Sequence, residues 1–131
     1  MADKLATLRG VPLFADLDER SLQAVAVLAR EVTAKAGDVL MLEGEPGDAF
    51  YVIVDGTIRV EHGDRAVRSM TLGGFLGEVA LVQHGARTAT ATCVTDCRLL
   101  ELRRHEFERL MDTMPAVHRR IRAAIERRTR D

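Results

Sequence analysis

Several features are scarce or missing in this chain of 131 residues, and each absence narrows what the protein can do. It has no Trp and only 4% aromatic residues, so its core must be built from aliphatic side chains. Its 19 basic and 20 acidic residues leave a formal net charge of −1, which gives no general attraction to nucleic acid or to an anionic membrane. No apolar run approaches the roughly 20 residues that span a bilayer, and Met1–Lys4 lacks the layout of a signal peptide. We therefore expect a single cytoplasmic domain without a membrane segment.

Cysteine and histidine are too few and too scattered to predict a metal centre. Cys93 and Cys97 are expected to be unpaired thiols on neighbouring strands in a reducing compartment, since no further ligands lie near them in the sequence. Among the four histidines, only His62 has an Asp two residues later, Asp64, and none forms a His-Glu-x-x-His pattern: His62, His84, His105 and His118. The Gly-Lys-Ser/Thr end of a triphosphate-binding loop is also missing. We predict no metal, no cofactor and no enzymatic activity.

What is present predicts a mainly β domain with flanking helices. A helix is expected over residues 18–32, capped by Asp18, within an N-terminal helical part that covers residues 1–36. Short β-prone runs separated by turns follow, over residues 39–42, 50–54, 57–61, 66–72, 88–93 and 98–102. Asp55-Gly56 favours a hairpin turn. This alternation of short strands and turns predicts a jelly-roll-like, double-stranded β-roll over residues 37–103. The C-terminal part, residues 104–131, is predicted to contain two helices, over residues 105–111 and 115–128.

The strand rhythm is interrupted over residues 73–89, where glycines surround a short helical stretch. Gly77 lacks a Cβ, so its backbone can approach a ligand closely. The first free N–H groups of the short helix favour an anion, and the planar fork of Arg87 matches two phosphate oxygens. Glu78 is an acceptor only, which suits ribose hydroxyls. A sugar-phosphate is the ligand that this combination favours, whereas a surface Glu and Arg without further context are more often solvated charges.

Two segments provide that context. The stretch Glu43–Gly56 resembles the β-roll signature of cyclic-nucleotide-binding domains, and Phe75–Leu81 followed by Arg87-Thr88-Ala89 resembles the phosphate-binding cassette of the same family. The family includes catabolite-activator regulators, regulatory subunits of cyclic-nucleotide-dependent kinases and cyclic-nucleotide-gated channels. The resemblance extends over nearly the whole chain, and it implies an N-terminal helix, a short cassette helix and two C-terminal helices around an eight-stranded type of roll.

The resemblance also implies a role for each cassette residue. Arg87 would pair with the cyclic phosphate, and Thr88 would support it through its N–H and hydroxyl. Gly77 and Glu78 would hold the ribose 2′-hydroxyl. The backbone of the next three residues would donate toward the phosphate: Val79, Ala80 and Leu81. The ligand implied is cAMP or cGMP, because a Thr at position 88 leaves guanine recognition open.

The same resemblance places the purine against an apolar wall and beneath the last helix, which would act as a lid. The candidates for the wall are Val60, Met70, Leu72 and Leu76. Arg127 or Arg128 could lie over the purine, although both could equally be solvated charges at a helix end. The turn at residues 72–75 is about two residues shorter than is usual in the family, and Leu76 and Ala86 replace a common Phe and Pro.

Two other functions stay open at this point. The chain could be a degenerate family member that binds no ligand and serves as an interaction module. It could also be the sensor part of a transcription regulator, although the chain alone is not expected to bind nucleic acid, since Ile121, Ala124 and Ile125 make the basic last helix an amphipathic, packed one. An effector domain or partner chain is possible, and its nature does not follow from the sequence.

Overall fold

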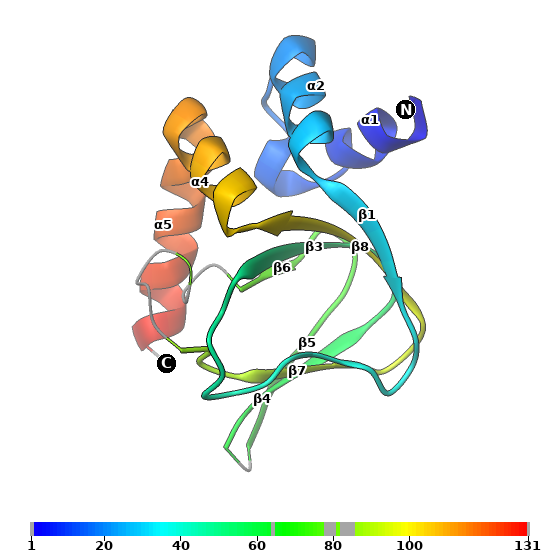
Figure 1. The fold of residues 1–131 in the computed structure, drawn as a ribbon, viewed down its shortest axis with the longest axis vertical. Helices are drawn as coiled ribbons and strands as arrows, with labels where there is room; N and C mark the ends of the chain where they lie inside the picture. The colour runs from blue at the N-terminus through cyan, green and yellow to red at the C-terminus, as the bar shows by residue number, and fades with distance from the viewer. Residues whose placement is uncertain (1, 64, 78–80, 82–85, 131) are drawn as a thin grey trace.

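Two four-stranded antiparallel sheets face each other in the computed structural model of the chain, and the helices gather on the outer side of one of them (Figure 1). The structure describes residues 2–63, 65–77, 81 and 86–130. The first sheet has the order β1-β8-β3-β6: Arg30–Ala34, Cys97–Arg103, Ala49–Asp55 and Phe75–Leu76. The second has the order β2-β7-β4-β5: Val39–Met41, Thr90–Cys93, Ile58–His62 and Arg65–Met70. This architecture confirms the predicted mainly β fold with flanking helices.

The helices come from the two ends of the chain. Those described are α1 (Ala2–Arg9), the 3-10 turn η1 (Pro12–Phe14), α2 (Glu19–Leu28), α4 (Arg104–Thr113) and α5 (Pro115–Arg130). The α2 helix begins as predicted, because the carboxylate of Asp18 accepts a hydrogen bond from the Ser21 N–H at 2.8 Å. None of the helices in the described ranges is long and apolar enough to cross a membrane.

The first sheet separates two apolar cores, because successive side chains of a strand point to opposite faces. In β3, Phe50 and Val52 belong to a helical core, shared with residues of η1, α2, α4 and α5. Tyr51 and Ile53 belong instead to a roll core between the two sheets. A tilted contact between the rings of Phe50 and Phe107, with centroids 5.1 Å apart, fastens α4 onto the sheet. The helices therefore rest directly on the strands that lead to the predicted site.

The predicted helix over residues 18–32 is wrong at its C-terminal end. The α2 helix ends at Leu28, and Ala29 already has the extended angles φ −87° and ψ 137°. Residues Arg30–Ala34 form β1, which pairs with β8 and turns Val32 toward the roll core. The N-terminal helical part therefore stops before residue 36. The helix α1 was also missed, because residues 1–12 carry only weak apolar periodicity.

The Asp55-Gly56 turn does not form the predicted hairpin. It joins β3 of the first sheet to β4 of the second, so it is a corner between sheets. Gly56 has φ +104°, and a Cβ there would lie 2.6 Å from both the Asp96 carbonyl oxygen and the Cys97 Sγ. Only glycine fits this corner. Cys93 and Cys97 are free, as expected, and both are buried. Their strands, β7 and β8, are consecutive in the chain but belong to different sheets.

Candidate functional site

Arg87 is the one charged residue that the structure describes as buried, with 6% of its surface exposed. Its backbone is fixed against the loop between β2 and β3: the Arg87 N–H donates to the Glu45 carbonyl at 2.8 Å, and the Gly44 N–H donates to the Arg87 carbonyl at 3.0 Å. A bridge between Pro46 and Ala86 continues this pairing. The two glycine-containing loops that the sequence singled out are therefore adjacent in space.

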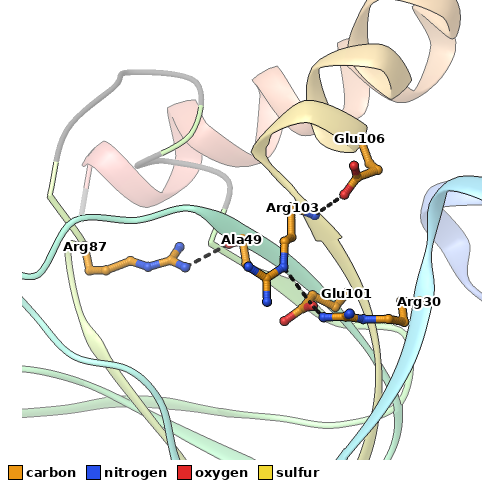
Figure 2. Close-up of polar contacts among 6 residues, drawn as sticks. All are labelled: Arg30, Ala49, Arg87, Glu101, Arg103 and Glu106. Carbon is orange, nitrogen blue, oxygen red and sulfur yellow. Dashed lines mark hydrogen bonds and ion pairs between the residues drawn. The ribbon is translucent and has the colours of Figure 1, made fainter.

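The guanidinium of Arg87 is held by backbone carbonyls at the inner face of the first sheet. Its Nη2 donates to the Ala49 carbonyl at 2.9 Å, and its Nη1 donates to the Gly77 carbonyl at 3.2 Å. Figure 2 shows the side chain reaching across to Ala49 at the start of β3. Carbonyl oxygens carry only partial charge, so an anionic oxygen would be a stronger partner for this buried cation. The arrangement suits the binding of a small anion.

Gly77 meets the conformational requirement that its place in the loop imposes. Its φ is +97°, and a Cβ would lie 2.5 Å from the Ala49 carbonyl oxygen and 2.8 Å from Arg87 Nη1. Any side chain at this position would push the guanidinium away from β3 or distort the loop. The close approach of backbone and arginine is therefore possible only with glycine here.

Of the four cassette residues that follow Gly77, the structure describes only Leu81. Glu78, Val79 and Ala80 lie outside the described residues, so their predicted contacts with ribose and phosphate stay predictions. Leu81 is helical, and its side chain is buried in the helical core. Its backbone role toward a phosphate also stays a prediction.

Thr88 and Ala89 lie where the cassette leads into β7. Thr88 is exposed, and its carbonyl accepts a hydrogen bond from the Nδ1–H of His62 at 2.7 Å. His62 also lies 3.5 Å from a carboxylate oxygen of Glu43. Ala89 is partly buried against the roll core. The hydrogen bond from His62 thus connects Thr88, near the end of the cassette, to the β4–β5 hairpin, while Thr88 itself is exposed to solvent.

Three of the four residues predicted to line a purine pocket lie together. Val60 and Leu76 are buried in the roll core, and Met70 packs against it. Leu72 is 63% exposed and lies in neither core; it lies two residues beyond Met70, the end of β5, and directly before Gly73. Arg127 is exposed near the end of α5, and the side chain of Arg128 lies outside the described residues.

A polar group on the inner face of the first sheet was not predicted. Glu101 of β8 accepts from Arg30 at 2.5 Å and lies 3.6 Å from Arg103 Nε (Figure 2). It also hydrogen-bonds Tyr51, whose pKa is raised by burial and by the charge of Glu101, while the nearby charge of Arg87 opposes the shift. Strand alternation places Glu101 and Arg103 on one face of β8. The contacts of Glu101 with Arg30 and Tyr51 depend on the β1-β8-β3 strand order, which the sequence does not reveal.

A separate groove of about 390 Å³ follows the outer face of α5. It is lined by Pro115, His118, Arg119, Arg122, Ala123 and Glu126. Arg122 Nε lies 3.2 Å from His118 Nε2 on this face. The groove includes none of the predicted site residues, and the chemistry at Arg87 is the better candidate for a ligand site. Among the described residues, no group of three or more His, Cys, Asp or Glu side chains is placed to hold a metal ion.

Comparisons with known proteins agree on one family. The family model described as "Cyclic nucleotide-binding domain" matches residues 31–114. Over 90% of its length the chain is 35% identical to a cyclic nucleotide-gated potassium channel from Rhizobium etli. Over 79% of its length it is 32% identical to the cAMP-dependent protein kinase regulatory subunit of Schizosaccharomyces pombe. The chain spans only 33% and 26% of the length of these two relatives.

Solved structures show the same likeness. The catabolite activator protein of Thermus thermophilus superposes with a TM-score of 0.82 at 27% identity, and the match covers 91% of this chain and 58% of that one. A structure described as cAMP-bound PfPKA-R superposes with a TM-score of 0.81 at 28% identity, covering 88% of this chain and 42% of that one. The similarity therefore includes both the roll and most of the flanking helices.

Proposed function

This chain belongs to the cyclic nucleotide-binding domain family, and on that premise we propose that it is a regulatory sensor that binds cAMP or cGMP at Arg87. The observation that carries this proposal is the buried guanidinium, aimed at the Ala49 and Gly77 carbonyls beside the roll core. Its bonds to these two carbonyls hold the guanidinium in one orientation beside the roll core. A cyclic phosphate supplies two anionic oxygens that match its fork of donors.

Neighbouring residues would complete the site around the phosphate. We propose that Glu78 and Gly77 hold the ribose 2′-hydroxyl and that the backbone of residues 79–81 donates to the phosphate. Thr88 is close enough in sequence to support the phosphate or to contact a guanine edge. Val60, Met70 and Leu76 already gather in the roll core and would form the apolar side of the purine pocket. Leu72 would have to move to join them, since it is exposed.

The C-terminal helices would transmit the effect of ligand binding. The apolar face of α5, through Val117, Ile121 and Ile125, packs in the helical core together with α4. We propose that ligand binding favours a different packing of α5, so that occupancy of the site shifts the population of lid positions. The proposed role involves binding without catalysis, since the described residues contain no group of three or more His, Cys, Asp or Glu side chains like the clusters that hold the metals of phosphodiesterases.

A thermal-shift screen with cAMP, cGMP and AMP tests the proposal. We expect either or both cyclic nucleotides to raise the melting temperature, because a ligand at 100 times its Kd stabilises the native state by about 2.7 kcal/mol. AMP, which carries a dianionic and non-cyclic phosphate, should stabilise the protein much less. No shift with either cyclic nucleotide at millimolar concentration would refute the proposal and favour a ligand-free interaction module.

A further inference from the structure

His62, the last residue of β4, donates a hydrogen bond to the stretch that carries the proposed phosphate ligand. Its Nδ1 lies 2.7 Å from the Thr88 carbonyl oxygen. A carbonyl oxygen can only accept, so Nδ1 carries the proton of this bond. Thr88 directly follows the buried Arg87 in the chain. The imidazole therefore holds the backbone one residue beyond the arginine that is proposed to bind the phosphate.

Glu43, in the loop between β2 and β3, supports both His62 and the turn beside it. One of its carboxylate oxygens accepts from the Gly63 N–H at 2.9 Å, and the other lies 3.5 Å from His62 Nδ1. The Glu43 N–H donates to the Thr90 hydroxyl at 3.0 Å, two residues beyond Thr88. A carboxylate near Nδ1 favours a proton on that nitrogen, which is the form that the bond to Thr88 requires.

The two peptide groups on either side of the Thr88 Cα are held by different parts of the chain. The first contains the Thr88 N–H and the Arg87 carbonyl, which accepts from the Gly44 N–H at 3.0 Å. The second contains the Thr88 carbonyl, which His62 holds. Because each peptide group is planar, fixing both planes also fixes the direction of the Thr88 Cα–Cβ bond. Thr88 is exposed, so hydrogen bonds rather than burial orient its N–H and its side chain.

We propose that His62, supported by Glu43, is a positioning residue that holds Thr88 ready for a cyclic nucleotide, an inference that rests on the proposed function. Without the imidazole donor, the peptide group between Thr88 and Ala89 samples several orientations. Ligand binding then has to order this group, and the lost conformational entropy reduces the binding free energy. With His62 in place, the group is already ordered in the ligand-free protein.

Titration calorimetry with cAMP and with cGMP, on the wild type and on variants of the β4–β5 hairpin, tests this role. His62→Ala should weaken nucleotide binding by about three- to tenfold, the loss expected for one intramolecular hydrogen bond. His62→Asn places an N–H donor at the same distance along the side chain as Nδ1, and it should restore most of the lost affinity. Ser69→Ala removes an exposed polar side chain from the other strand of the hairpin and should bind as the wild type does.

The backbone amide resonance of Ala89 provides a second, spectroscopic measurement. The Ala89 N–H and the Thr88 carbonyl belong to one peptide group, so the resonance reports on the bond from His62. In the ligand-free protein, nuclear magnetic resonance should show this resonance displaced in His62→Ala and returned toward its wild-type position in His62→Asn.

A merely stabilising role of His62 would lower the melting temperature of His62→Ala and leave its affinity for nucleotide unchanged. That result would overturn the inference and leave the proposed function standing. The same conclusion would follow from an undisplaced Ala89 resonance in His62→Ala, or from a loss of affinity that His62→Asn does not recover. A wild type that binds neither nucleotide would overturn both the inference and the proposed function.

Discussion

At the scale of single residues, the chain holds one arginine in a place that is costly for a charge. Arg87 is 94% buried by its surroundings, and two of its acceptors are backbone carbonyls. These two bonds satisfy one donor on each terminal nitrogen and hold the guanidinium in one orientation. The resemblance of residues 73–89 to a phosphate-binding cassette predicted Arg87 and Gly77 as ligand-binding residues. It did not predict that Arg87 contacts the Ala49 carbonyl, because that contact depends on how two distant loops pair.

Cys93 illustrates a second buried group at this scale, and it should be chemically inert. Burial raises the pKa of the Cys93 thiol to about 12, and a hydrogen bond with Cys97 adds to the shift. At pH 8 a thiol with that pKa is ionised to only about 1 part in 10,000, and the thiolate is the reactive form. Cys97→Ala removes the contribution of Cys97 to this shift but keeps the burial of Cys93, which is then the remaining thiol. In this variant the folded protein should still react with Ellman's reagent far more slowly than the protein unfolded in guanidinium. Equal rates in the two states would contradict the burial described here.

At the scale of elements, the corner between β3 and β4 decides how the two sheets face each other. The dipeptide Asp55-Gly56 has the chemistry of a hairpin turn, and local sequence cannot tell a hairpin from a corner. The choice is made by tertiary pairing: β3 finds β8 and β6, whereas β4 finds β7 and β5. The β1 strand was missed for a similar reason, since its residues continue the apolar spacing of α2 until pairing with β8 takes over.

Gly56→Ala tests the corner against a matched control. A Cβ at Gly56 would lie 2.6 Å from two atoms and 2.9 Å from a third, so left-handed strain and overlap add together. We expect a loss of about 2–5 kcal/mol in the free energy of unfolding, measured with urea. Gly44→Ala has a similar φ of +90° with nothing within 4 Å of the Cβ, so it should lose only about 1–2 kcal/mol. Equal losses in the two variants would show that the close packing at the corner does not matter.

At the scale of the whole molecule, the sequence predicted the roll and its helical flanks better than it predicted how they connect. Strand runs such as residues 50–54 and 98–102 are strongly β-prone and bounded by turns, so their existence follows from local pattern. Arg104 carries no such signal. Its guanidinium reaches carbonyls 23 and 57 residues away in the chain, and nothing in its neighbourhood distinguishes it from the adjacent, exposed Arg103.

The central claim is that Arg87 binds the phosphate of a cyclic nucleotide, and titration calorimetry tests it most directly. The measurement compares cAMP and cGMP binding to the wild type, to Arg87→Ala and to Arg87→Lys, with Arg20→Ala as an exposed control on α2. We predict at least tenfold weaker binding in Arg87→Ala, which corresponds to about 1.4 kcal/mol, partial recovery in Arg87→Lys and no change in Arg20→Ala. Equal affinity in the wild type and Arg87→Ala would contradict the account.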